Sequence, residues 1–380
     1  MNLFEIYILA YTFVAILYLW YRYIFIFGYN DKTYGNYSGK VSVVVPYYNE
    51  KPELLIRTIK SINACYGDKE IIVVDDGSTS KDCYNAMKKL QSQIKFQLIR
   101  YEKNMGKRYA QCLAFEKAKG EILMTVDSDT ILEKKAILEL IKPFSDKKVG
   151  ATTGQLEALN RNTNFLTKMQ AARYWNAFNF ERQSQGTFGC IVCCSGPISA
   201  YRKEIVLGFI NKYKNQHFLG KACTFGDDRH LTTLILKNGY EIKFVKSARG
   251  YTAVPETWKG LIKQQIRWKK SWIRETYLVS KFMKKNKPLS FEVAFTTFIT
   301  FFSLAARIML IVSLLMVPLY FLYVIPMILF MGTIHSLYVL FNKPEHFPYS
   351  IAYSFVQVFL IYWLLFIALF TFKDTRWGTR

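Results

Sequence analysis

Four long apolar runs lie near the two ends of the chain. Residues 3–27 are almost wholly apolar, and about 20 such residues suffice for a helix that crosses a bilayer. No small-residue cleavage site follows this run and no basic region precedes it, so we expect a retained transmembrane helix rather than a signal peptide. Three further apolar stretches lie near 292–314, 318–341 and 349–372.

The segment that begins at Val41 has a different pattern, in which short β-branched runs alternate with amphipathic stretches of helix length. This alternation predicts an α/β fold with a parallel sheet covered by helices on both faces. Ligands of such sheets bind at the carboxyl ends of the strands. The predicted strands are Val41–Val45, Ile71–Val74, Phe96–Tyr101 and Ile122–Val126, and the predicted helices lie near Pro52–Ala64, Lys81–Gln93 and Gly106–Lys119.

A strongly basic amphipathic segment, Trp258 to Phe282, follows this region and is expected to lie in the membrane interface with its apolar face down. The whole chain has a formal net charge of +23. In a soluble protein that charge would suggest a nucleic-acid partner. Because 51% of the residues are hydrophobic and the apolar runs are long, we expect anionic membrane lipid instead, and no nucleic acid.

These patterns predict five consecutive parts. They are an N-terminal transmembrane helix (1–30), an α/β domain (31–257), interfacial amphipathic helices (258–288), a C-terminal transmembrane and interfacial region (289–372) and a short tail (373–380).

Two acidic motifs come directly after predicted strands. Asp75 and Asp76 follow the second strand and precede a Gly-Ser turn, which suits a contact with uridine or ribose, although Asp-Gly also makes an ordinary turn. Asp127 and Asp129 follow the fourth strand. Side chains alternate on extended backbone, so these two carboxylates face the same way and can flank one hard cation, Mg²⁺ or Mn²⁺. The other interpretation of this pair is a solvated acidic turn.

Two further motifs carry groups suited to sugar transfer. Asp228, within Gly226–Thr232, could deprotonate an attacking hydroxyl, although acidic residues also occur as ordinary helix caps. Gln264, Arg267 and Trp268 lie in the basic segment. Arg neutralises a leaving diphosphate through forked hydrogen bonds, and Trp offers a flat face to a sugar ring. The other interpretation of these residues is an interfacial helix with Trp268 as its aromatic anchor.

The chain has seven cysteines, three of them clustered at Cys190, Cys193 and Cys194. Such spacing can bind zinc, but no second pair at comparable spacing is present. Reduced, packed thiols in a cytosolic domain are the preferred interpretation.

The order Asp-Asp-Gly-Ser, Asp-x-Asp, Gly-Asp-Asp and Gln-x-x-Arg-Trp, framed by membrane segments, resembles processive family 2 glycosyltransferases, which include cellulose, chitin and hyaluronan synthases. The resemblance covers about residues 41–380 and implies a GT-A-like nucleotide-sugar-binding domain. Finer details resemble bacterial-type hyaluronan synthases, including Asn104–Arg108, Ser195–Pro197 with Tyr201 and Arg202, and the terminal Trp377–Arg380. Cellulose synthases usually have Thr-Glu-Asp in the third motif and chitin synthases often have Gly-Glu-Asp. This chain has Gly-Asp-Asp, which favours the hyaluronan synthases. The chain departs from the family in its single N-terminal apolar run, where two are common.

Position by position, the resemblance implies a role for each motif residue. Uridine would be held by Glu50, Asp75 and Asp76, the donor by Lys107 and Asp127, and the metal by Asp129 with Asp127, while Asp228 would be the general base. The diphosphate and acceptor end would be bound by Gln264, Arg267 and Trp268, the acceptor site lined by Ser195, Gly196 and Pro197, and the donor covered by a gating segment containing Trp377 and Arg380.

The expected activity is inverting transfer from UDP-sugars to a growing polysaccharide that is exported across the plasma membrane, with hyaluronan from UDP-GlcNAc and UDP-GlcA as the first choice. Chitin or chitooligosaccharide synthesis from UDP-GlcNAc alone, a non-processive membrane glycosyltransferase, and a non-enzymatic transporter or scaffold remain alternatives. Cytosolic donors and the positive-inside rule predict a multi-pass protein with a cytosolic catalytic domain. If the tail is to reach that domain, one apolar stretch must not cross, and we expect 349–372 to lie along or dip into the cytosolic face.

Overall fold

The computed structural model describes residues 3–29 and 34–374, and its contacts divide them into two compact units. The helical unit takes residues 3–29, 161–184 and 254–372, and the sheet unit takes 34–160, 185–253 and 373–374. Residues 161–184 therefore pack with the helical unit, although they interrupt the stretch that the sequence marks as one catalytic domain. The five-part division stays a prediction.

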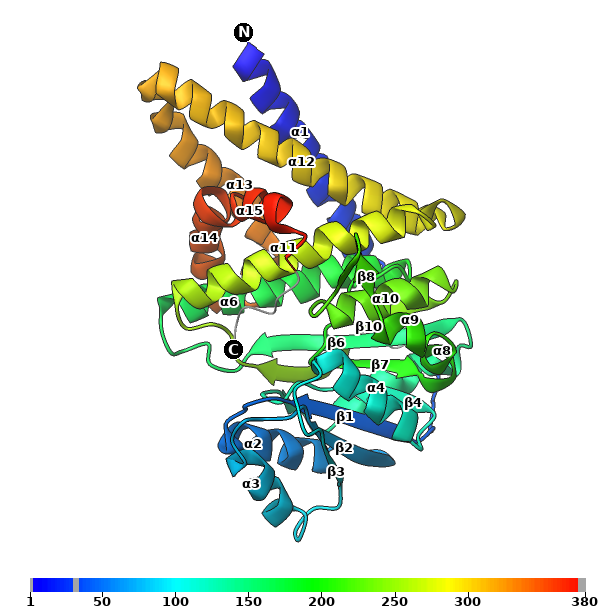
Figure 1. Cartoon of the computed structure of the whole chain (residues 1–380). Helices are drawn as coiled ribbons and strands as arrows, with labels where there is room; N and C mark the ends of the chain where they lie inside the picture. Colours follow the sequence, from blue (N-terminus) through cyan, green and yellow to red (C-terminus); the bar gives the residue numbers. More distant parts are fainter. Residues whose placement is uncertain (1–2, 30–33, 375–380) are drawn as a thin grey trace. The chain divides into compact units, whose positions relative to one another are not determined.

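The sheet unit contains ten strands. Their bounds are β1 Val41–Tyr47, β2 Lys69–Asp75, β3 Gln97–Arg100, β4 Ile122–Thr125, β5 Ile131–Leu132, β6 Val149–Ala158, β7 Ser199–Arg202, β8 His217–Phe218, β9 Lys221–Ala222 and β10 Glu241–Thr252. Eight of them form one sheet in the order β3-β2-β1-β4-β7-β6-β10-β5, and β8 and β9 pair separately as a hairpin (Figure 1). The first four positions of the large sheet are parallel, and β7 runs antiparallel to both β4 and β6. The expected mostly parallel, GT-A-like α/β domain is confirmed.

Helices cover the parallel half of the sheet. The helices of the sheet unit are α2 Pro52–Asn63, α3 Asp82–Leu90, α4 Lys107–Lys117, α5 Ala136–Ile141 with the 3₁₀ turn Lys142–Ser145, α8 Lys203–Gly208, α9 Ile210–Lys214 and α10 Asp227–Lys237, while α7 (Gln183–Thr187) contains the point where the chain passes between units. All seven residues of β1 are buried, as a parallel strand covered on both faces requires. Right-handed crossovers put α2 and α3 on one face and α4 on the other.

The strand order reverses beside β1, since β2 and β3 lie to one side of it and β4 lies to the other. In parallel α/β sheets this reversal opens a crevice outside the carboxyl ends of the strands, where ligands bind. The acidic motifs at Asp75 and Asp127 lie at the ends of β2 and β4, on either side of β1. The fold therefore brings them to one edge of the sheet.

The helical unit consists of helices throughout. Their bounds are α1 Leu3–Phe27, α6 Phe165–Asn176 with the π-helical turn Ala177–Arg182, α11 Trp258–Ser280 with the 3₁₀ turn Met283–Lys285, α12 Lys287–Met316, α13 Phe321–Asn342 preceded by Pro318–Tyr320, α14 Phe347–Val356 preceded by Pro344–His346, the π-helical turn Gln357–Ile361, and α15 Leu364–Thr371. Three stretches in the described chain are long and apolar enough to cross a membrane: Glu5–Phe27, Lys287–Met316 and Pro318–Asn342. The fourth apolar run forms a pair, Pro344–Ile361 and Leu364–Thr371, bent by 41°. Such a bend fits a broken span or a re-entrant segment.

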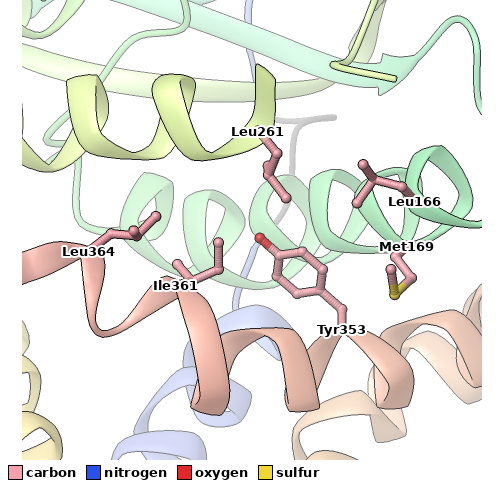
Figure 2. Close-up of a cluster of buried hydrophobic side chains, with 6 residues drawn as sticks. All are labelled: Leu166, Met169, Leu261, Tyr353, Ile361 and Leu364. Carbon is pink, nitrogen blue, oxygen red and sulfur yellow. The ribbon is translucent and has the colours of Figure 1, made fainter. Parts of the chain in front are cut away.

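A buried cluster joins four separate parts of the helical unit. Figure 2 shows Tyr353 of α14 between Leu261 of α11 and residues of α6, and the neighbouring turns contribute Ile361 and Leu364. The cluster members are Leu166, Met169, Leu261, Tyr353, Ile361 and Leu364. Burial of each such side chain stabilises the packing by roughly 1.5–3 kcal/mol. The amphipathic helix α11 is thus fixed by its apolar face to the bent C-terminal pair and to α6.

Candidate active site

The two carboxylates that follow β4 interact with different partners. Asp127 and Asp129 are both half-buried, and Asp129 Oδ1 accepts a hydrogen bond from Thr252 Oγ1 at 3.1 Å. Ser128, between them, is buried and donates to Glu50 Oε2 at 2.6 Å. Residues 128 and 129 form a turn, closed by the hydrogen bond from the Thr130 N–H to the Asp127 carbonyl at 3.1 Å, so the extended backbone expected between the two aspartates is not present. Ser128 ties Glu50 to this turn.

The Asp75-Asp76 pair organises the loops at the end of β2. Asp75 is fully buried, accepts from the backbone N–H of Ser78 at 2.9 Å, and lies 3.6 Å from Arg100 Nε. Asp76 is 2% exposed and accepts from the backbone N–H groups of Met105 and Gly106, each at 2.9 Å. The loop that leads into α4 is therefore held by Asp76.

Gly77 makes the turn after this pair. It has φ +69°, and an added Cβ would lie 2.2 Å from the Lys103 carbonyl carbon. Both the positive φ and the close approach of that backbone require glycine. The turn therefore packs directly on the segment that carries Asn104, whose side-chain amide donates to Asp76 Oδ2 at 3.1 Å.

Lys107, the first residue of α4, connects the carboxylate groups. Its Nζ lies 2.6 Å from Asp127 Oδ1 and 3.5 Å from Asp227 Oδ2. Burial disfavours its charged form, but the charges of Asp127 and Asp227 outweigh burial, and the pKa of Lys107 is raised above its ordinary value. The ammonium is therefore charged at every physiological pH.

Asp227 and Asp228 form the first turn of α10, which begins after Gly226 in the left-handed conformation (φ +75°). The helix N-terminus favours negative charge there. Burial and the charge of Asp227 nevertheless raise the pKa of Asp228, against the opposing effect of Lys107. A carboxylate with a raised pKa is a better proton acceptor, as general base catalysis requires.

The segment Ser195-Gly196-Pro197 passes through the middle of this group. The backbone N–H of Ser195 donates to Thr153 Oγ1 of β6 at 3.1 Å. A Cβ added to Gly196 would lie 3.6 Å from Asp127 Oδ1, 3.6 Å from Lys107 Nζ and 3.7 Å from Asp228 Cβ. One buried glycine is thus surrounded by a β4 carboxylate, the α4 ammonium and the α10 carboxylate, which come from three motifs far apart in sequence.

Sequence comparison assigns this arrangement to a family. Residues 42–208 match the family model described as glycosyl transferase family 2. The chain is 36% identical over 356 residues to a hyaluronan synthase of Streptococcus pyogenes, covering 90% of this chain and 83% of the relative. The chain belongs to glycosyltransferase family 2.

Two further similarities place this glycosyltransferase among its relatives. It is 33% identical over 353 residues to an N-acetylglucosaminyltransferase of Azorhizobium caulinodans, covering 90% of this chain and 87% of that one. In structure it is similar to a mannosyltransferase from Pyrobaculum calidifontis solved with GDP-Man and Mn²⁺, with a TM-score of 0.69, 18% identity and 97% coverage of both chains. The structural similarity supports the GT-A-like fold.

The residues of the glycosyltransferase site fit a divalent cation shared with a donor diphosphate. Among the described residues, no group of three or more His, Cys, Asp or Glu side chains is placed to hold a metal by itself. Four aspartate carboxylates, at 127, 129, 227 and 228, outnumber the charge of Lys107. An anionic diphosphate would need additional positive charge there, and oxygen ligands suit Mg²⁺ or Mn²⁺.

A pH dependence follows from the two carboxylates with raised pKa values. Burial raises the pKa of Asp76 to about 6, and the pKa of Asp228 is also above its ordinary value. Because the folded-state pKa of Asp76 is raised, its protonation favours folding, fully below the ordinary value near 4 and no longer once pH passes about 6; Asp228 contributes with the same sign. If Asp228 is the general base, as the sequence predicts, activity has the opposite sign, because that carboxylate must be ionised to accept a proton and ionised Asp76 holds the α4 loop.

We therefore expect the rate of sugar transfer to fall as pH is lowered from 7 to 5. The measurement is the initial rate of UDP release at saturating donor. In the Asp76→Asn variant, the fall in rate at low pH should reflect the titration of Asp228 alone. A wild-type rate that stays flat down to pH 5 contradicts this assignment.

Five predicted site residues are not part of the sheet unit as the structure describes it. Gln264, Arg267 and Trp268 are on α11 of the helical unit, where the Gln264 Oε1 atom is buried without a hydrogen-bond partner in the described chain. Trp268 is 41% exposed, as a stacking platform would need to be. Trp377 and Arg380 lie outside the described residues, so their gating role stays a prediction.

The structure adds site residues that the sequence did not single out. Asn49 has φ +49°, and its Oδ1 accepts from both the N–H and the hydroxyl of Thr79. Thr252 reaches Asp129 from the distant strand β10. Asn49 beside Glu50 carries a weak sequence signal, since Asn tolerates the left-handed conformation. Thr252 carries none, because only the antiparallel pairing of β10 with β5, which begins two residues after Asp129, brings it there.

Proposed function

We propose that this glycosyltransferase is a processive hyaluronan synthase of the plasma membrane, which polymerises UDP-GlcNAc and UDP-GlcA on a cytosolic catalytic domain and exports the polymer. The observation that carries the proposal is the convergence of Asp127, Lys107 and Asp228 around Gly196. It supplies a cation for the donor phosphates, a carboxylate for a metal, and a base. The similarity to a streptococcal hyaluronan synthase over 90% of the chain supports the choice of product.

The chemistry is a single displacement at the anomeric carbon with inversion. Asp228 accepts the proton of the acceptor hydroxyl, and the backbone at Gly196 leaves the space beside it open. Lys107 holds the donor phosphates with a charge that does not titrate. A divalent cation, when bound by Asp127 and Asp129, supplies further stabilisation of the departing diphosphate. The mannosyltransferase with a similar fold was solved with Mn²⁺, which supports this cofactor class.

A cation-rich cluster in the helical unit supports a polymer that contains a uronic acid. The Arg307 guanidinium carbon lies 3.5 Å from the centroid of the Tyr362 ring, and Lys269 Nζ lies 5.8 Å from the same ring. Arg173 is paired with Glu181 at 2.9 Å. Burial, then the charges of Arg307 and Arg173, lower the pKa of Lys269 to about 8. A carboxylate on the polymer would relieve this repulsion between cations.

The structural context of this cluster also indicates function. Arg307 lies in the candidate span Lys287–Met316, and ionisable residues in membrane helices are costly and usually mark a pathway. Glu181 lies in the π-helical turn 177–182, and Tyr362 directly follows the π-helical turn 357–361. Single π-helical turns are frequent at functional sites. Arg307 Nε is buried without a hydrogen-bond partner in the described chain, so a donor remains for a ligand.

Synthesis of a chitooligosaccharide from UDP-GlcNAc alone is the second candidate. The similarity to an N-acetylglucosaminyltransferase of Azorhizobium caulinodans, at 33% identity and 90% coverage, favours it. A neutral polymer would bring no negative charge to the cations around Tyr362.

Donor dependence separates the two candidates. We expect sustained UDP release by the purified protein in lipid nanodiscs only when UDP-GlcNAc and UDP-GlcA are both present, because each transferred sugar creates the acceptor for the other. Arg307→Met should lower this two-donor rate several-fold and leave slow single-donor UDP release unchanged. Lys343→Met, which removes a cation paired with Glu345 outside the cluster, is the matched control. Sustained release from UDP-GlcNAc alone would support the chitooligosaccharide instead.

A further inference from the structure

A buried chain of polar side chains connects α4 to α10 behind the site. Arg108 is 4% exposed; it donates from Nη2 to Gln216 Oε1 at 2.9 Å and from Nη1 to the Cys223 carbonyl at 3.0 Å. The Gln216 amide nitrogen lies 2.8 Å from His230 Nδ1 on α10. The backbone of Gln216 also accepts from the N–H of Cys223 at 2.9 Å. The base of the β8–β9 hairpin is therefore held between the two helices.

The direction of every hydrogen bond in this chain follows from Arg108. A guanidinium has only donors, so the atom of Gln216 that faces it must be the oxygen. The amide nitrogen then faces His230 and donates, and Nδ1 of His230 must accept. His230 is thereby fixed as the tautomer that carries its proton on Nε2. Replacing Arg108 removes the group that orients the side chains of Gln216 and His230.

A stacked pair of rings packs beside the same chain. The Arg108 guanidinium lies 5.3 Å from the Tyr213 ring centroid, and Tyr213 stacks on His230 with centroids 6.2 Å apart and planes inclined by 14°. Tyr213 is fully buried, and its hydroxyl donates to Gln111 Oε1 at 2.6 Å. Gln111 lies one turn after Arg108 on α4. Two successive turns of α4 therefore contact one surface that includes α10.

The charge of Arg108 is buried without an acidic partner in the described part of the chain, where its hydrogen-bond acceptors are neutral oxygens. Burying a charge without an opposite charge is unfavourable. Apolar packing would stabilise this interior at least as well. The residue is therefore better explained by what it positions than by stability.

The first turns of the two connected helices carry the reactive groups. Lys107 directly precedes Arg108, and His230 lies two residues after Asp228. We propose that Arg108 is a positioning residue for sugar transfer, which acts through Gln216 and His230 to fix Asp228 relative to Lys107 and Asp127. This inference rests on the proposed role of Asp228 as the base. A misplacement of about 1 Å at a reacting group can lower a rate by about 10²-fold.

The test is a double-mutant cycle between Arg108→Met and Asp228→Asn, with kcat and KM for the donor and the Kd for UDP measured for each variant. We expect Arg108→Met to lower kcat by about 10- to 100-fold with the donor KM and the UDP Kd changed by less than about threefold. In the Asp228→Asn background the same substitution should lower the residual rate by less than about twofold, because positioning no longer matters once the base is lost. Arg108→Lys, which keeps the charge but not both hydrogen bonds, should recover part of kcat.

Tyr213→Phe is the matched control for a general loss of core stability. It removes a buried hydrogen bond from the same surface and keeps the ring beside Arg108 and His230, so kcat should stay within about twofold of wild type. If Arg108→Met does not fold, Arg108→Lys carries the cycle alone. The inference is overturned by a kcat within twofold of wild type, by an equal loss in the Asp228→Asn background, or by a loss in KM alone. Full activity of Asp228→Asn by itself would instead contradict the proposed function.

Discussion

Replacing Asp228 with Asn is expected to lower sugar transfer by about 10²–10⁴-fold, the usual contribution of general base catalysis. The amide has nearly the same size as the carboxylate but cannot accept the proton of the attacking hydroxyl. The backbone of α10 should be unaffected, because an Asn side chain can still accept the bond that Arg229 N–H donates to Oδ1 at 2.7 Å. Binding of UDP should change little. The measurements are the initial rate of transfer and the Kd for UDP.

Asp82→Asn is the matched control for this experiment. Asp82 is likewise an acidic residue in the first turn of a helix, but it is exposed on α3 and interacts with Ser80. Both substitutions remove a charge that stabilises a helix N-terminus, an effect of only about 0.3–1 kcal/mol. We expect Asp82→Asn to turn over at close to the wild-type rate. If Asp228→Asn behaves in the same way, Asp228 is only a helix cap.

The second large effect is expected from Asp129→Asn and from chelation. If a divalent cation bridges Asp129 and the donor diphosphate, its removal withdraws several kcal/mol of stabilisation from the transition state, which corresponds to at least about 10²-fold in rate. Excess EDTA should stop transfer by the wild-type protein, and added Mg²⁺ or Mn²⁺ should restore it. Asp129→Asn should be nearly inactive at any concentration of either metal, while its circular dichroism spectrum matches that of the wild type.

Thr252→Val separates the metal-binding role of Asp129 from its local hydrogen bonding. The substitution removes the hydroxyl that donates to Asp129 Oδ1 and leaves the carboxylate in place. We expect a loss of only a few-fold in rate and a modest increase in the metal concentration needed for half activity. Full activity in excess EDTA would show that transfer needs no metal. A Thr252→Val variant as inactive as Asp129→Asn would show that the carboxylate acts through the Thr252 contact.

The sequence predicted the parallel half of the sheet and the position of its acidic motifs. The strands at 41–47, 69–75 and 122–125 overlap the predicted runs because buried parallel strands have continuous apolar sequences. The strand at 97–100 also overlaps its predicted run, although it lies at the edge of the sheet and none of its residues is buried. The pattern also placed Asp127 and Asp129 directly after the fourth strand, at its carboxyl end, without any coordinates. Local pattern was sufficient here because both the strand signal and the motif lie within a few residues of each other.

The rest of the site depends on contacts between residues far apart in sequence. Nothing in the pattern around Arg108, Gln216 or His230 indicates that they form one buried chain, since each is polar and would be expected at the surface. The antiparallel strand β7 and the distant strand β10, which brings Thr252 to Asp129, were likewise not assigned. Residues 161–184 pack with the helical unit because they are buried against its other helices. The periodicity of that segment alone does not predict which unit it joins.

The central claim is that this chain builds a polymer of two alternating sugars, and product composition tests it most directly. The purified protein in lipid nanodiscs would be incubated with UDP-GlcNAc and UDP-GlcA, each with a different radiolabel, and the high-molecular-weight product isolated. The account predicts the two labels in a ratio near one to one, in material that a hyaluronan lyase degrades and a chitinase does not. Product that carries only the GlcNAc label and is degraded by chitinase would contradict it.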